Sequence, residues 1–263
     1  MAMVSNIFLS MISQFFHHFH FTEEKFLIAG GFVDGGLNDP SLTKLTEVVE
    51  IVKSNSTPSF GQLPSRREGA VGTMFGNVPT MCGGWDGPSE LDSCISFENS
   101  QWIQSHNMNE KRRFSAGVQI NSTTFWILGG EYFYEGSYVY VYLDSTELII
   151  HGQTSGIPGP KLPYKLSNFC AAKLSENEIF VVGGTSGSEV PRNEVWIFDP
   201  QNGFARKQGP SLNNKRYSHS CITMRVGDKK FIIVSGGLDE NYLDSVEIYD
   251  PIDKIWHLGK KIC

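Results

Sequence analysis

The chain contains no long apolar run, which excludes a simple membrane-spanning helix. Among its 263 residues, no stretch reaches the 18 or more apolar residues that such a helix requires. Positive charge is also scarce, since 22 Lys and Arg stand against 28 Asp and Glu, for a net charge of -6. A nucleic-acid-binding surface needs a basic stripe, and this sequence has none. We therefore expect neither membrane insertion nor a nucleic-acid partner.

What recurs along the chain is a pair of glycines that ends a short apolar run. The copies are FLIAGG, VPTMCGG, FWILGG, IFVVGG and FIIVSGG, and their first glycines are residues 30, 83, 129, 183 and 236. A period near 50 residues indicates one supersecondary unit that is repeated and that buries its apolar face only against its neighbours. The repeat therefore predicts one domain, although the length alone would allow two.

Each copy reads as four strands. An alternating segment such as residues 113–120 opens it, and a polar turn leads into the apolar run that ends at the glycines. A variable loop, a strand such as residues 245–250 and a last strand opened by an aromatic residue complete the unit. Alternation with period two between Gly, Pro and Asn clusters is typical of β-sheet, and no segment shows sustained helical periodicity.

The N-terminal residues admit two interpretations. Residues 7–16 are apolar enough for the core of a signal peptide, but no basic segment precedes them and no small-residue cleavage site follows. Alignment on the glycines instead makes residues 14–21 the first strand of the first repeat. We expect residues 1–13 to be a tail that precedes the repeats.

The unit resembles the kelch repeat, in which a double glycine is followed by a Tyr and a Trp at set distances. The fifth copy fits best, with Gly236, Gly237, Tyr249 and Trp256. In the third copy, residues 138–142 supply aromatics but no Trp follows. The corresponding pairs elsewhere are Phe198 and Phe204 in the fourth copy, Phe97 and Trp102 in the second, and Val52 and Phe60 in the first.

The resemblance implies an all-β fold, a kelch-type β-propeller of about five four-stranded blades over residues 14–263. Kelch propellers usually have six or seven blades, so the alternatives are a ring closed by five blades and an incomplete six- or seven-bladed ring; we favour the second. The expected repeats span about residues 14–62, 63–106, 107–153, 159–208 and 209–260.

The cysteines fall at positions where two pairs are expected to meet. Cys82 precedes the second Gly-Gly and Cys94 lies in the following strand, so the two would face each other across one antiparallel ladder. Cys170 and Cys221 occupy equivalent places in the first strands of adjacent copies. The alternative is that each cysteine is a small buried apolar residue. Disulfides would favour an oxidising compartment, and we prefer an extracellular to a cytoplasmic location.

The resemblance also raises an enzymatic alternative, a degenerate copper-radical oxidase or another sugar-active kelch enzyme. Copper-radical oxidases hold copper with two His and two Tyr near the propeller axis. Here only His219 lies in an expected inner strand beside a Tyr, and one imidazole does not make a copper site. We find no phosphate-binding loop or nucleophile elbow. We expect no catalytic residue, no metal and no cofactor.

The feature that we expect to carry function is a set of cations before the innermost strands. We place them in one register on the rim around the central opening, where similarly placed arginines of cullin-adaptor kelch domains bind acidic peptides. The alternative is that they form hydrogen bonds inside the propeller. The four residues are Arg67, Arg113, Lys165 and Arg216.

The loops that follow the glycines lie on the same rim, and Trp85 and Tyr132 each lead one of them. Exposed aromatic residues are good anchors for a protein interface. The sequence therefore predicts a non-catalytic protein-binding scaffold, whose partner presents an acidic peptide or surface to the cations and contacts these two aromatics.

Overall fold

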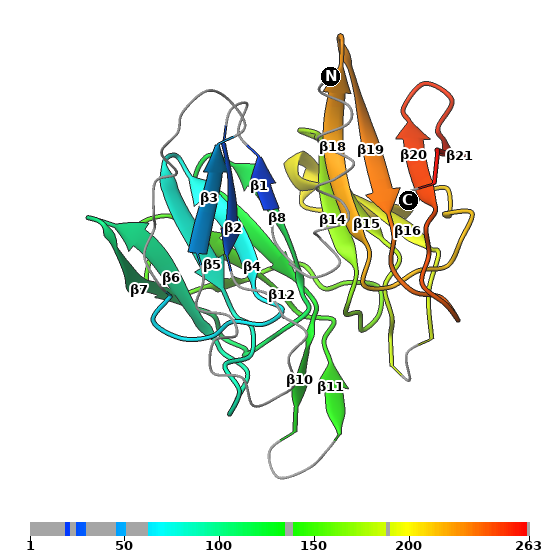
Figure 1. Ribbon diagram of the computed structural model, residues 1–263. Helices are drawn as coiled ribbons and strands as arrows, with labels where there is room; N and C mark the ends of the chain where they lie inside the picture. The colour runs from blue at the N-terminus through cyan, green and yellow to red at the C-terminus, as the bar shows by residue number, and fades with distance from the viewer. Residues whose placement is uncertain are drawn as a thin grey trace.

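The computed structural model describes residues 63–134, 139–187 and 190–261 in full, and before them the backbone of three strands at 19–21, 25–29 and 46–50. The expected tail over residues 1–13 lies outside the described residues. The described part forms five antiparallel sheets that follow one another along the chain, each packed on the next, and one separate two-stranded hairpin (Figure 1). The expected all-β propeller is confirmed, while the idea that its five blades belong to a larger ring stays a prediction.

Four of the five blades have four described strands. Blade 1 shows β1 (Phe19–Phe21), β2 (Lys25–Ala29) and β3 (Thr46–Glu50). Blade 2 contains β4 (Val71–Phe75), β5 (Val78–Cys82), β6 (Ser93–Glu98) and β7 (Gln101–Asn107). Blade 3 contains β8 (Ala116–Asn121), β9 (Thr124–Leu128), β12 (Thr146–Ile150) and β13 (Ile157–Pro158). Blade 4 contains β14 (Cys170–Ser175), β15 (Glu178–Val182), β16 (Val195–Asp199), η1 (Pro200–Asn202) and β17 (Ala205–Gln208). Blade 5 contains β18 (Ser220–Val226), β19 (Lys229–Ser235), β20 (Val246–Asp250) and β21 (Ile255–Leu258).

Blade 3 differs from the arrangement that the sequence predicts. Its glycines are followed by an additional two-stranded hairpin, β10 (Glu131–Phe133) and β11 (Tyr140–Tyr142), which pairs with no blade. The third strand of the blade is β12, so Ile149 holds the place of the kelch Tyr. The fourth strand, β13, lies beyond residue 153, where we expected this repeat to end.

The core lies between the blades, because blades 2, 3 and 4 each have a blade on either side. This is why the runs before the glycines are apolar without alternation: in β15, Ile179 to Val182 are all buried. Phe180 and Val182 pack toward Ile232 and Val234 of blade 5, whereas Ile179 packs toward blade 3. Burial of each such side chain stabilises the fold by roughly 1.5–3 kcal/mol.

The glycine pairs are required where each blade meets the connector of the next. Gly183 and Gly184 have φ values of +59° and +95°, which strain any residue with a Cβ. A Cβ on Gly183 would lie 2.7 Å from the carbonyl oxygen of Arg216, in the next blade. One on Gly184 would lie 2.5 Å from the Cβ of Phe169. Gly183 therefore allows the close contact between blades 4 and 5, and Gly184 allows blade 4 to pack closely on its own connector.

Backbone hydrogen bonds link the blades just before their first strands. The N–H of Phe114 donates to Gly69 O at 2.8 Å, that of Asn168 to Phe114 O at 2.9 Å, and that of Ser218 to Asn168 O at 2.8 Å. All four residues have φ between +50° and +67°. The left-handed conformation is costly for a residue such as Phe114. The same conformation recurs at the equivalent position of each of these blades, which indicates that the inter-blade hydrogen bonds determine it.

Both expected disulfides are present. Cys82 and Cys94 face each other on β5 and β6, with their Cα atoms 4.0 Å apart. Cys170 and Cys221 join β14 to β18 and so connect blades 4 and 5, with their Cα atoms 5.9 Å apart. Two disulfides favour an oxidising compartment. No helix among the described residues is long and apolar enough to span a membrane.

Candidate functional site

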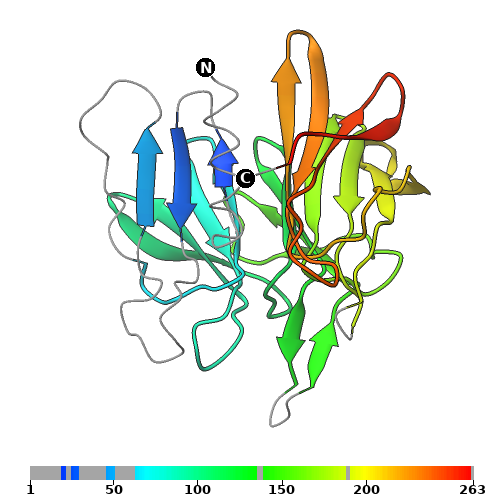
Figure 2. The ribbon, with the colours of Figure 1, turned by 45° about the vertical axis from the view of Figure 1, so that its right-hand side comes forward.

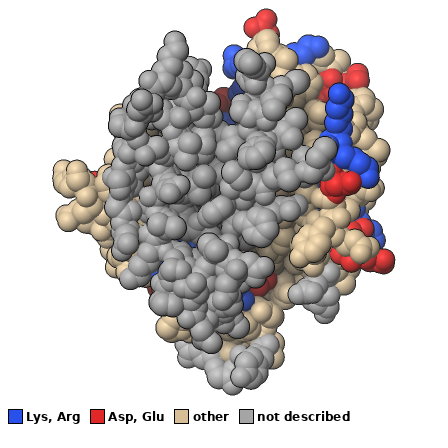
Figure 3. Space-filling model, in the orientation of Figure 1, with Lys and Arg blue, Asp and Glu red and all other residues tan. Residues whose placement is uncertain are grey.

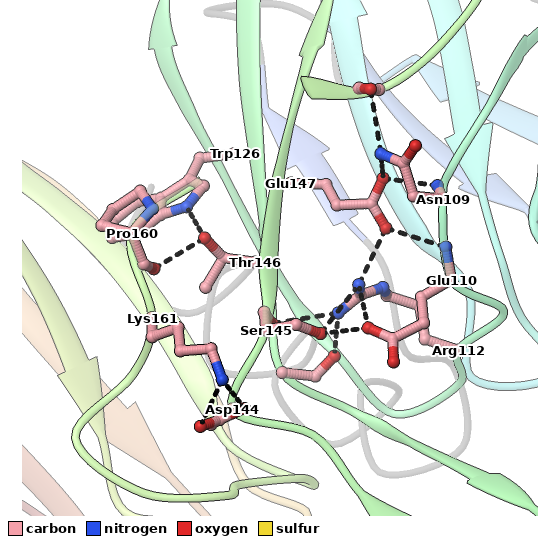
Figure 4. Close-up of polar contacts among 12 residues, drawn as sticks. Asn109, Glu110, Arg112, Trp126, Asp144, Ser145, Thr146, Glu147, Pro160 and Lys161 are labelled. Atoms are coloured by element: carbon pink, nitrogen blue, oxygen red, sulfur yellow. Dashed lines mark hydrogen bonds and ion pairs between the residues drawn. The ribbon is translucent and has the colours of Figure 1, made fainter. Parts of the chain in front are cut away.

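The arginines before the first strands belong to a buried polar module, seen best in blade 3 (Figure 4). Arg112 is fully buried and donates to Gly129 O at 2.7 Å and to Glu147 Oε1 at 2.8 Å. Glu147 also accepts hydrogen bonds from the backbone N–H groups of Asn109 and Glu110, at 2.6 and 3.1 Å. The module ties the connector to the third strand of its own blade.

The expected register of the four cations is corrected by this module. In blades 2, 3 and 4, the N–H of the second glycine donates to the carbonyl of one residue in the next connector, and those residues are Arg112, Leu166 and Arg216. Arg113 and Lys165 each lie one residue away from the equivalent position. Adjacent residues of an extended segment point to opposite sides, so a shift of one residue places a side chain in a different environment.

The in-register arginines are also not on an open rim. Arg67 and Arg216 are 3% and 0% exposed, and each donates to the carbonyl of the first glycine in its own blade, at 3.0 and 2.6 Å. The alternative of internal hydrogen bonds therefore describes both residues, and neither is proposed below to contact a partner. Lys165 is exposed.

The modules differ in whether a carboxylate balances the arginine. Arg216 pairs with fully buried Glu247 at 2.9 Å, as Arg112 does with Glu147. Burial lowers the pKa of Arg67 to about 10, and the charges of Asp86 and Asp92 only partly oppose this shift. In blade 4, Leu166 and Trp196 replace the Arg–Glu pair, and Trp196 packs edge-on against Tyr164.

The end of the propeller that carries the loops after the glycines, termed here the loop face, presents aromatic side chains. The β10–β11 hairpin projects from it, beyond the ends of the blades (Figures 1 and 2). On this hairpin Tyr134 and Val139 are each 62% exposed and Tyr140 is 43% exposed. The rings of Phe133 and Tyr140 stack with their centroids 4.2 Å apart.

The two aromatics singled out by the sequence lie on this face and are half-buried. Tyr132 belongs to β10, and the Lys111 ammonium lies 5.5 Å from its ring centroid. Trp85 is bridged by backbone pairing to Glu68 on one side and Glu90 on the other. The repeat alignment assigns Tyr140 to a blade strand, and only the structure shows that Tyr134 and Tyr140 are exposed on a hairpin.

Arg113 lies beside Trp85, where the loop faces of blades 2 and 3 meet. Its Nε is 3.7 Å from Glu90 Oε1 and 3.8 Å from Glu131 Oε1. Its guanidinium carbon lies 5.8 Å from the Trp85 ring centroid and 4.8 Å from that of Phe133. Glu131 accepts a further hydrogen bond, from Ser167 Oγ of blade 4 at 2.7 Å. Polar contacts thus run across three blades.

His219 has an internal partner as well. It is 7% exposed, and its Nε2 bonds to the Val182 carbonyl of blade 4 at 3.1 Å. Burial, reinforced by the charge of Arg216, lowers its pKa to about 3. The imidazole is therefore neutral in the folded protein and supports the junction between two blades.

This histidine predicts acid destabilisation. The unfolded chain binds a proton below about pH 6.5 and the folded one only near pH 3, so stability falls as the pH drops through this window, by about 1.4 kcal/mol per unit. Between pH 7 and pH 5, urea unfolding should show the wild type losing about 2 kcal/mol more than His219→Gln. Equal losses in the two proteins would contradict the assignment.

One group among the described residues has the side chains of a metal site. The ligand atoms of Asp250, Asp253 and His257 lie within 4.8 Å of one another on the outer strands of blade 5. Asp253 and His257 are exposed, and Asp250 already accepts the N–H of Ile252 at 2.7 Å. This group carries no proposal. On the face shown in Figure 3, both basic and acidic side chains lie on the described surface along the right side.

Comparisons with known proteins agree with this architecture. The Kelch motif family model matches residues 232–261, in blade 5. No curated protein matches the chain. The solved structure titled "Structure of YjhT" is similar, with a TM-score of 0.75 over 93% of this chain and 83% of that chain, at 9% sequence identity. Identity this low shows the fold alone. The comparisons therefore show a Kelch motif in blade 5 and a propeller fold for the described residues.

Proposed function

We propose that the protein is a non-catalytic binding scaffold whose loop face recognises a protein partner. The observation that carries this proposal is the β10–β11 hairpin, which holds exposed Tyr134 and Tyr140 beyond the ends of the blades. Tyr is enriched among the residues that dominate interface energies, because a rigid ring buries much area with little loss of entropy. Trp85 and Tyr132 extend the same surface toward the neighbouring blade.

The two disulfides support a place for this interaction outside the cytoplasm, since they persist in oxidising compartments. The oxidase alternative gains no support from His219, whose Nε2 bonds to a backbone carbonyl. We therefore favour binding over catalysis and an extracellular site of action.

The hairpin gives a direct test of the proposal. Peptides selected from a random phage-displayed library on the wild-type protein should bind Tyr134→Ser/Tyr140→Ser at least tenfold more weakly, because two anchoring rings are lost. Surface changes of this kind should alter the free energy of unfolding by less than about 1 kcal/mol.

A matched control is Ile252→Ser/Ile255→Ser, at the turn between β20 and β21, where the two side chains are 60% and 49% exposed. It removes comparable exposed apolar area away from the loop face and should leave peptide binding unchanged. If no peptide is enriched, or if the two double variants bind alike, the loop face is not the binding surface.

A further inference from the structure

Three acidic residues gather where the loop faces of blades 2 and 3 meet. Glu68 and Trp85 exchange backbone hydrogen bonds of 2.9 and 2.8 Å, and Trp85 is bridged in turn to Glu90. Residues directly opposite in antiparallel pairs present their side chains on the same side, so the indole lies between two carboxylates. Glu131, from the first position of β10, approaches the same cluster through Arg113.

The cluster has more negative charge than its described basic residue can balance. Glu68 and Glu90 contribute two carboxylates, and the one described guanidinium beside them, that of Arg113, also faces Glu131. The two ion pairs of Arg113 Nε are 3.7 and 3.8 Å long, beyond hydrogen-bonding distance. Glu90 is only 5% exposed, and its Oε1 accepts no hydrogen bond from a described residue; Arg113 Nε, 3.7 Å away, likewise donates none. A buried carboxylate oxygen without a donor is costly, and a donor from a ligand would offset that cost.

We propose that Glu68 and Trp85 form a subsite for a cationic side chain, Arg or Lys, of the protein partner. Both residues are half-buried, so each keeps a part of its side chain accessible to a ligand. A guanidinium or ammonium group there would pair with the Glu68 carboxylate and contact the indole face, two interactions that favour the same charge. This inference rests on the proposed function and gives its partner a basic character.

The state of Glu68 agrees with an incomplete site. Burial raises the pKa of its carboxyl group, and the charge of Arg113 only partly opposes that shift. The charged carboxylate is therefore destabilising in the free protein, and a cation from a partner would relieve it. Arg216 is already paired with Glu247, and Arg67 is 3% exposed, so neither arginine is available to an acidic partner.

The test uses the random peptide library panned on the full-length wild-type protein. The proposal expects the enriched peptides to share an Arg or Lys, and a synthetic peptide of that sequence to bind Glu68→Gln at least tenfold more weakly. The control is Glu98→Gln: Glu98 is a half-buried Glu of the same blade at the far end of β6, and its loss should leave affinity unchanged.

A double-mutant cycle separates recognition from a structural effect. Replacement of the peptide's basic residue by Gln should weaken binding to wild type tenfold and binding to Glu68→Gln hardly at all. Because the raised pKa of Glu68 means that its charge opposes folding at neutral pH, Glu68→Gln should melt at the same or a higher temperature. If Glu68→Gln does not fold, the same cycle with Trp85→Leu replaces it.

Enriched peptides that are acidic or neutral, or basic peptides whose affinity shows no coupling to Glu68 or Trp85, would overturn this inference while leaving the proposed function in place. Failure of the proposed function has a different signature, which is the absence of enriched peptides or binding that does not depend on Tyr134 and Tyr140.

Discussion

Replacement of Glu247 by alanine should lower the free energy of unfolding by about 3–5 kcal/mol. The carboxylate is fully buried and accepts hydrogen bonds from Arg216 Nη2 at 2.9 Å and from the backbone N–H groups of Asn213 and Asn214 at 2.7 and 3.0 Å. Its removal leaves the Arg216 guanidinium buried without a counter-charge, and burial already lowers the pKa of this group. Urea unfolding of wild type and variant measures the loss.

The matched control is Glu194→Ala in blade 4. Glu194 pairs with Arg192 at 2.9 Å, but both side chains are partly exposed, so its loss should cost less than about 1 kcal/mol. The variant Arg216→Leu/Glu247→Leu should lose less than the sum of the two single losses, because it removes both charges together. Such a replacement has a precedent in blade 4, where Leu166 and Trp196 hold these positions. If Glu247→Ala lost no more than Glu194→Ala, the module would contribute little to stability.

Sequence alone predicts those parts of the fold that depend on repetition or on strand pairing. The glycine pairs mark the end of the second strand in each blade because close inter-blade contact admits no Cβ there. The Cys82–Cys94 pair follows from antiparallel pairing of consecutive strands, and Cys170–Cys221 from their equivalent places in adjacent copies. The glycines and the cysteines are therefore predictable because each residue type has the same structural role at every position where it recurs.

The candidate site could not be predicted in the same way. Arg112 and Arg113 are adjacent, and only the backbone hydrogen bonds show that Arg112 is equivalent to Arg67 and Arg216 while Arg113 belongs to the loop face. The left-handed position before the first strands is Gly, Phe, Asn or Ser in the four blades, so no residue type marks it.

The tyrosine-rich hairpin was also misplaced, since Tyr140–Tyr142 has the composition of a kelch third strand but pairs with β10. The position of the hairpin depends on tertiary pairing, because Thr146–Ile150 and not the tyrosine-rich segment pairs with β9 as the third strand of the blade. The strongest exposed anchors of the loop face therefore emerge only from the structure.

Removal of the Cys170–Cys221 disulfide should destabilise the protein by about 4 kcal/mol, and removal of Cys82–Cys94 by about 3 kcal/mol. The difference arises because the first pair closes a loop of 51 residues and the second one of 12, and a longer loop restricts the unfolded chain more. Urea unfolding of the two variants, Cys170→Ala/Cys221→Ala and Cys82→Ala/Cys94→Ala, compares the two losses.

If removal of Cys82–Cys94 cost more stability than removal of Cys170–Cys221, native-state packing would outweigh loop closure. Packing could matter here because Cys82 and Cys94 are fully buried and alanine leaves a cavity at each. Unfolding each variant with and without reductant separates the two effects, since reduction of the remaining disulfide opens its loop without removing side-chain atoms. Cys82→Ala/Cys94→Ala retains the disulfide that closes the long loop, and Cys170→Ala/Cys221→Ala retains the one that closes the short loop. If loop closure dominates, reduction should destabilise the first variant more than the second. Because Cys170–Cys221 joins the first strands of blades 4 and 5, its reduction should also increase hydrogen exchange in β18 before β14.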